Sequence, residues 1–215
     1  MTRHRFLLGA ALLTLAAARP LSAQRVLDWQ YRWYWGAKGG MLSYTLPSGS
    51  RAVPQVGAEW LITARRVALY IGYSSTFAAE ADTFAVPGLT GGARGVTFDA
   101  FRRIQIGLLT LIGDKAFQPY VGGGFVIQTL SNARSTAATP TTTDVNAITA
   151  AASGGFLQVM AGFQLRMGKK AALFAHYQLS PQGRAFLLAG GANSFEGGLR
   201  YAFLSAKEDD PTRRQ

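Results

Sequence analysis

Few side chains in this sequence are of the types that carry out covalent chemistry. The chain contains no cysteine, and its two histidines are His4, near the start, and His176. Ser180 follows His176 by four residues, a spacing that invites a test for a histidine and serine pair. On a β-strand, residues i and i+4 share a face but lie roughly 13 Å apart, too far for the imidazole to take the hydroxyl proton. We therefore predict no catalytic residue and no enzymatic activity, and we interpret His176 as a paired interior histidine.

The sequence also lacks the patterns of other common sites. One histidine with scattered carboxylates does not make a metal-ligand cluster, and the glycine-rich segment 91–95 lacks the Lys-Ser/Thr of a phosphate-binding loop. The formal net charge is +11. Much of this charge lies in short turns, where it suits anionic lipid headgroups better than nucleic acid: Arg65, Arg66, Lys115, Lys169 and Lys170. We expect no cofactor, no metal and no nucleic-acid partner.

Charged and amide residues instead recur at two-residue intervals within apolar segments. In residues 193–203, Phe195 and Leu199 alternate with Glu196 and Arg200. Because successive side chains of a strand point to opposite faces, one face is apolar and the other is charged. The same alternation elsewhere predicts an interior polar network made of Lys38, Glu59, Asp99, Arg103, Gln105, Gln158, Gln164, Arg166, His176, Glu196 and Arg200.

Eight segments with this alternation follow one another, each about as long as a tilted strand that crosses a bilayer. They are residues 33–45, 54–63, 67–77, 98–111, 117–128, 157–167, 171–179 and 193–203. The turns 64–66, 113–116 and 168–170 are short, whereas the segments 78–95, 131–155 and 181–192 are long; the short segment 46–53 is the exception. Outer-membrane barrels place short turns on the periplasmic side and long loops outside. We predict an all-β fold, an eight-stranded antiparallel up-and-down transmembrane β-barrel.

The two ends of the chain differ from the barrel segments. Residues 1–23 are typical of a cleaved secretory signal, with Arg3 and Arg5 before an apolar run that is too short to span a bilayer as a helix. An uncleaved anchor is the alternative. We expect the barrel to occupy residues 24–203, residues 204–215 to form a periplasmic tail, and the low-complexity loop 131–155 to be exposed and mobile.

The interior and the outer face of such a barrel have opposite requirements. An interior of about eight strands is just filled by side chains, so we expect no wide pore. The interior charges then form either a polar plug or a gated path for protons or small ions. Aromatic residues suit the interfacial belts; the candidates are Trp29, Trp33, Trp35, Trp60, Tyr73, Phe98, Phe163, Tyr177 and Phe203. The alternative is a soluble barrel whose apolar face forms the core.

Three segments resemble the small OmpA/OmpX-like outer-membrane β-barrel family: residues 36–40 (GAKGG), 119–124 (PYVGGG) and 197–203 (GGLRYAF). The resemblance implies the outer membrane of a Gram-negative-type cell envelope, reached by signal-dependent export. It also implies outer-membrane lipids and the insertion machinery as partners, the latter reading a terminal aromatic residue that Phe203 matches.

Three functions are compatible with these features. The first is a non-enzymatic barrel without a wide pore, with a structural or adhesive role through external loops that meet an extracellular ligand. The second is transport of small or hydrophobic molecules across the outer membrane. The third is a lipid A-modifying enzyme, although the His-x-Ser-Asn pattern of the lipid A deacylases is absent around His176.

Overall fold

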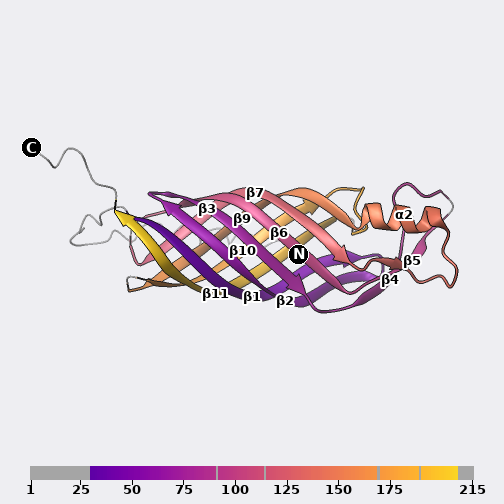
Figure 1. Cartoon of the computed structure of the whole chain (residues 1–215), viewed down its shortest axis with the longest axis horizontal. Helices are drawn as coiled ribbons and strands as arrows, with labels where there is room; N and C mark the ends of the chain where they lie inside the picture. Colours follow the sequence, from indigo (N-terminus) through magenta and orange to yellow (C-terminus); the bar gives the residue numbers. More distant parts are fainter. Residues whose placement is uncertain (1–29, 91, 114, 169, 189, 208–215) are drawn as a thin grey trace, which may run out of the picture.

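The computed structural model describes residues 30–90, 92–113, 115–168, 170–188 and 190–207. The expected signal segment 1–23 lies outside these residues. Eight long strands are present: β1 (Gln30–Leu46), β2 (Gly49–Ala64), β3 (Val67–Thr76), β6 (Ala100–Leu111), β7 (Phe117–Ser131), β9 (Ser153–Met167), β10 (Ala171–Gln182) and β11 (Gly190–Lys207). They form a closed barrel in the order β1-β11-β10-β9-β7-β6-β3-β2, with antiparallel neighbours throughout (Figure 1). The predicted eight-stranded antiparallel barrel is confirmed.

Within the described part of the chain, no helix is long and apolar enough to cross a membrane.

Several strands are longer than the alternation predicted. β1 and β2 continue to a turn at Pro47 and Ser48, so most of the expected loop 46–53 is strand. The reason is that Leu42, Tyr44 and Leu46 keep the inward alternation and are buried. At the other end, β11 continues past Phe203 to Lys207, which pairs with Gln30 of β1.

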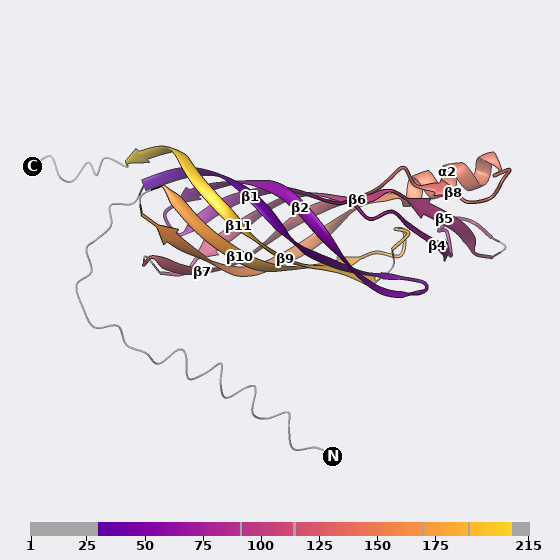
Figure 2. The same cartoon turned by 90° about the horizontal axis from the view of Figure 1, so that it is seen from below.

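The long segments on the external side are folded. β4 (Glu80–Phe84), β5 (Arg94–Phe98) and β8 (Arg134–Ser135) form a three-stranded sheet, and α2 (Thr142–Ala151) follows β8. Figures 1 and 2 show these elements beyond one end of the barrel, next to the projecting β1–β2 hairpin. We call these elements, from residue 77 to 99 and from 132 to 152, the external cap.

Residues 131–155, expected to form an exposed mobile loop, are largely exposed but contain a short strand and a helix. Thr141 and Asp144 make a capping box at the start of α2, which satisfies backbone N–H groups that a helix leaves unpaired. Ile148 and Ala151, three residues apart, are buried on one side of the helix. Two apolar contacts are too few to produce a visible period in the sequence, but they suffice to hold a ten-residue helix against the barrel mouth.

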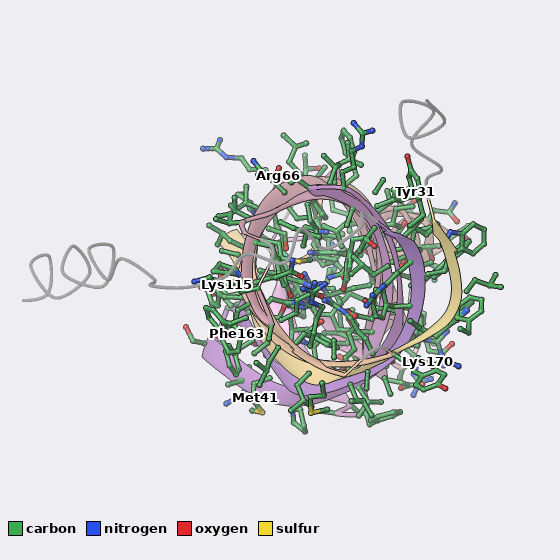
Figure 3. The ribbon with its side chains drawn as sticks, turned by 90° about the vertical axis from the view of Figure 1, so that its left-hand side faces the viewer. Tyr31, Met41, Arg66, Lys115, Phe163 and Lys170 are labelled. Carbon is green, nitrogen blue, oxygen red and sulfur yellow. The ribbon has the colours of Figure 1, made fainter. Side chains whose placement is uncertain are left out.

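The outward face of the barrel is an apolar belt. Along β6, Ile104, Ile106 and Leu108 are 53%, 50% and 60% exposed, and the intervening residues are buried. Figure 3 looks along the barrel from its short-turn end and shows nitrogen and oxygen atoms inside the ring, with mostly carbon around it. A soluble barrel would have the opposite arrangement, because apolar surface is buried away from water. The outward face is therefore the lipid-facing surface of a transmembrane barrel.

The interior is layered along the barrel axis. On the inward face of β6, Phe101 is followed by Arg103 and Gln105, and then by Leu109 and Leu111. The outer apolar cluster fills the external end and comprises Leu42, Tyr44, Leu46, Val53, Phe84, Val86, Val96, Phe98, Phe101, Leu130, Ile148, Ala151, Ala152, Phe186, Leu187, Leu188 and Ala192. The inner apolar cluster lies toward the short turns and comprises Tyr34, Leu61, Ala68, Tyr70, Leu109, Leu111, Tyr120, Met160 and Ala202. Buried polar side chains lie between the two.

Candidate functional site

The polar layer between the two apolar clusters contains two carboxylates, and Glu196 is the centre of the larger group. Its carboxylate lies 2.7 Å from Lys38 Nζ, 3.1 Å from His176 Nε2 and 3.8 Å from Arg103 Nη1. Gln55 Nε2 donates a hydrogen bond to it at 2.9 Å. These partners come from β1, β10, β6 and β2, so the contacts of one carboxylate tie together strands from around the barrel.

The hydrogen bonds of His176 define its orientation. Nδ1 lies 3.0 Å from the hydroxyl of Tyr120, and Nε2 faces Glu196. Gln178 Nε2 also lies 2.9 Å from Nε2. An imidazole protonated at Nε2 can donate to the carboxylate while Nδ1 accepts from the hydroxyl. The imidazole is thus held at both nitrogens, which agrees with the interpretation of a paired interior histidine.

The second carboxylate, Glu59, forms an ion pair with Arg200 Nε. Arg200 also donates to Gln164 Oε1 at 3.0 Å, and its guanidinium lies 4.0 Å from the centre of the Phe174 ring. Gln164 in turn donates to Gln118 at 2.8 Å. The planar guanidinium therefore combines an ion pair, an amide contact and a cation–π contact in a site without water access.

Amides and hydroxyls connect these charges. Lys38 Nζ donates to the Tyr70 hydroxyl at 2.8 Å and to Gln105 Oε1 at 3.1 Å. Arg103 donates to Ser194 Oγ at 2.8 Å and to Gln178 Oε1 at 3.1 Å. Because a buried charge without partners costs several kcal/mol, this set of contacts holds the charges in one arrangement.

The structure places most of the predicted interior residues in this layer. The buried ones are Lys38, Glu59, Arg103, Gln105, Gln158, Gln164, His176, Glu196 and Arg200. Arg166 lies at the short-turn rim instead, partly exposed, where its guanidinium donates to the carbonyl of Lys115 at 3.1 Å.

Asp99 was wrongly predicted to be an interior residue. It lies at a bend between β5 and β6, where its side chain is 44% exposed and accepts from Asn132 Nδ2 at 2.7 Å. The chain leaves the barrel after β3 and returns only at Ala100, so Asp99 belongs to the external cap. The same detour explains why Phe98, expected in the lipid belt, is buried in the outer apolar cluster.

Several members of the polar layer were not predicted, notably Gln55, Tyr70 and Ser194. Each of these residues occupies an inward-facing position of its strand, which could have identified it. Tyrosine, however, is usually counted as an apolar residue. Tyr70 also needs space that Gly72 provides: a Cβ there would lie 2.5 Å from the Tyr70 hydroxyl oxygen and 2.7 Å from Gln105 Oε1. A single glycine thus allows the Lys38–Tyr70–Gln105 contact to form.

The hydrogen bonds of Ser180 lead away from His176. Its hydroxyl accepts from Gln128 Nε2 at 2.8 Å and donates to the carbonyl of Ala192 at 3.2 Å. Among the described residues, no group of three or more histidine and carboxylate side chains could hold a metal ion.

Ion pairs hold the external cap together and tie it to the barrel. Arg94 of β5 contacts Asp144 of α2 at 2.9 Å, and Arg51 of β2 contacts Glu80 of β4 at 3.7 Å. Hydrogen bonds from the Thr141 hydroxyl and from Arg94 lower the pKa of Asp144. Hydrogen bonds from Ser48, at the tip of the β1–β2 hairpin, lower the pKa of Asp82 in β4 in the same way.

Comparison with known proteins gives structural likeness alone. No protein-family model matches the chain, and no curated protein matches it in sequence. The crystal structure of Neisserial surface protein A superimposes with a TM-score of 0.55 at 12% identity, covering 80% of this chain and 97% of that one. The fold is that of a small outer-membrane β-barrel. The expected likeness to OmpA/OmpX-like barrels is thereby confirmed for the fold.

Two further barrels from Pseudomonas aeruginosa are similar. The outer membrane protein OprG matches at 14% identity with a TM-score of 0.48, covering 82% of this barrel chain and 96% of its own. The N-terminal β-barrel domain of OprF matches at 12% identity with a TM-score of 0.46, covering 79% and 97%.

Proposed function

We propose that this protein is a non-enzymatic outer-membrane barrel, closed to solutes, that meets an extracellular ligand through its external cap. It reaches the outer membrane by export with cleavage of residues 1–23, and it contacts outer-membrane lipids through its apolar belt. The observation that carries the proposal is the layered interior, in which a paired polar layer lies between two apolar clusters. Such an interior stabilises the barrel, so the external cap is the part that can contact a ligand.

The construction of the cap supports an interaction role. A loop without a task has no need of a capped helix, a three-stranded sheet and ion pairs between them. Thr142, Thr143 and Asn146 are exposed on α2 and present hydroxyl and amide groups. This surface suits a polar, uncharged partner, because such groups both donate and accept hydrogen bonds.

Other roles have less support. An aqueous path would have to cross two apolar clusters and break the contacts of Glu196 and Lys38. A lipid-modifying reaction would need a free nucleophile beside a base, whereas the hydrogen bonds of Ser180 go to Gln128 and Ala192.

Two measurements test the proposal. In planar bilayers the purified barrel should give no stepwise conductance, and regular steps would contradict the closed interior. Display on a heterologous Gram-negative host should increase binding to arrays of glycans and matrix proteins. The matched control replaces residues 137–150 by a short Gly-Ser turn and should lose that binding while still reaching the surface. Equal binding by the two forms would contradict the role of the cap.

A further inference from the structure

The outer mouth of the barrel is occupied by an apolar piece of an external loop. Phe186, Leu187 and Leu188 lie between β10 and β11 and are buried in the outer apolar cluster. The Leu187 N–H donates to the carbonyl of Ala151, at the end of α2 just before β9, at 3.0 Å. Gly183 precedes the segment and Gly190, with φ of +114°, follows it. Glycine at both sides allows the backbone to rearrange without steric penalty.

Next to this segment the barrel wall is incomplete. Pairing between β9 and β10 ends at Leu179 and Val159, although β9 continues to Ser153 and β10 to Gln182. These ends pair only with β7 and β11, respectively. Pro181 lies in the part of β10 that pairs with β11 alone, as is typical of a strand edge.

The region without pairing between β9 and β10 begins within the apolar belt. Leu157, which lies beyond the last β9–β10 pair, faces outward and is 66% exposed. Its neighbour Phe156 faces inward and packs edge-on against Phe186, with ring centroids 5.3 Å apart. At this point side chains, rather than a hydrogen-bonded sheet, separate the outer apolar cluster from lipid.

The strand ends at this point also carry polar atoms without partners. Among the described residues, Gln158 Oε1 on β9 and Gln182 Oε1 on β10 are buried and accept no hydrogen bond. An unpaired buried acceptor costs free energy, so it marks a place where a donor is missing. An apolar cluster bordered by free acceptors is complementary to a molecule with an alkyl chain and a donor head.

We propose that the outer mouth binds a single-chain amphiphile that enters from the outer leaflet between β9 and β10. Its alkyl chain takes the place of Phe186, Leu187 and Leu188, and the O–H of a hydroxyl head donates to Gln158 Oε1. The polar layer below stops the chain from going further, so the site binds and does not transport. This inference goes beyond the proposed function and does not depend on it.

The absence of cysteine allows a direct test. The double variant Phe156→Cys with Phe186→Cys, placed in lipid nanodiscs, can be locked by oxidation and released by a reductant. The probe is a long-chain alcohol with a dansyl group at its far end, followed by fluorescence. We expect the reduced form to bind it and the oxidised form to lose binding. A cross-link between Thr45→Cys and Ser50→Cys, which are paired in the β1–β2 hairpin, is the matched control and should leave binding unchanged.

A second arm tests the head group. Gln158→Leu removes an acceptor and keeps the alkyl pocket, so it should weaken binding of the alcohol roughly tenfold. Binding of the methyl ether of the same probe should not change. Heat-modifiable migration on gels confirms that each variant is folded. The proposal is overturned if the wild-type protein does not bind the alcohol, if oxidation has no effect, or if alcohol and ether bind equally. None of these outcomes bears on bilayer conductance or on binding by the cap.

Discussion

At the scale of single residues, two carboxylates determine how the interior is held. Glu196 faces Lys38, Arg103 and His176, whereas Glu59 faces Arg200. Three cations and two carboxylates share a space without bulk water, so each charge depends on named partners. The consequences of removing one partner follow from this arrangement.

Glu196→Ala should strongly destabilise the barrel. It leaves Lys38 and Arg103 without their carboxylate, and removing one partner of a buried pair costs roughly 3–5 kcal/mol. Lys170→Ala, in an exposed turn, should change the free energy of unfolding by about 0–1 kcal/mol. Urea unfolding in lipid vesicles measures both. The double change Glu59→Gln with Arg200→Met should cost less than the two single changes together, and strict additivity would contradict the pairing.

Gly72→Ala should also destabilise the barrel, by about 1–3 kcal/mol, because its Cβ would overlap the Tyr70 hydroxyl and Gln105. Gly155→Ala is a suitable control, since no atom lies within 4 Å of the added Cβ. The same urea titration compares the two. Similar urea midpoints for both variants would show that the polar layer accommodates the added methyl group without loss of stability.

At the scale of elements, the external cap and the barrel are stabilised by different interactions. The barrel strands share a continuous ladder of pairs, whereas the cap depends on a few apolar contacts and ion pairs. Elements with few buried contacts open at lower free energy than the ladder itself. The cap should therefore respond to changes that leave the barrel intact.

Ile148→Ala should loosen α2 without unfolding the barrel. Truncation of a buried isoleucine costs about 2–5 kcal/mol, which exceeds what the rest of a ten-residue helix supplies. Limited proteolysis should cut residues 137–151 faster in the variant than in the wild-type protein. The heat-modifiable band on gels should remain, and its loss would show that the cap is needed for barrel folding. Val145→Ala, an exposed position on the same helix, serves as the control.

Acid should release α2 from β5. The pKa of Asp144 is lowered in the folded protein, so its contribution is present above the unfolded pKa of about 3.9 and is lost as pH falls through the folded pKa. Hydrogen exchange of residues 142–151 should therefore increase below about pH 4. Asp144→Asn should abolish most of that pH dependence and raise exchange at neutral pH. Unchanged exchange in the variant would mean that the Arg94 contact does not hold the helix.

At the scale of the whole molecule, aromatic side chains orient the barrel in the bilayer. Trp33, Trp35, Trp60 and Phe203 form one cluster on the outward face, with Trp35 and Trp60 stacked at 5.6 Å between ring centroids. They lie on β1, β2 and β11, toward the end with the short turns. Arg66 and Lys170 lie in turns at the same end, as Figure 3 shows. Aromatic rings followed by basic residues are typical of a membrane interface.

Tryptophan fluorescence should therefore report an interfacial position. Phospholipids brominated near the headgroup should quench it more strongly than phospholipids brominated near the end of the acyl chain. Trp35→Phe should remove a large part of this difference, whereas Tyr177→Phe should not alter it. Stronger quenching by the deep bromines would place the cluster in the middle of the bilayer and contradict the assigned orientation.

The spacing of residues along the chain is sufficient to predict the barrel and the composition of its two faces. Strand side chains alternate with a period of two, so Glu196 and Leu199 could be assigned to opposite faces from spacing alone, and short and long turns could be sorted by length. Local patterns of this kind need no knowledge of distant residues.

Which residues contact one another depends on how distant strands come together in the folded chain. Glu196 contacts Lys38 because β11 closes on β1, and that contact joins residues 158 positions apart, which no local pattern encodes. The fold of residues 131–155 was missed for the same reason, since Ile148 is buried in the outer apolar cluster, whose members come from separate strands and loops. Asp99 was assigned to the interior because it fits the inward positions of the predicted strand 98–111. The backbone bends at Asp99, however, so its side chain belongs to the external cap. Alternation predicts the face on which a side chain lies, and long-range closure determines its partners.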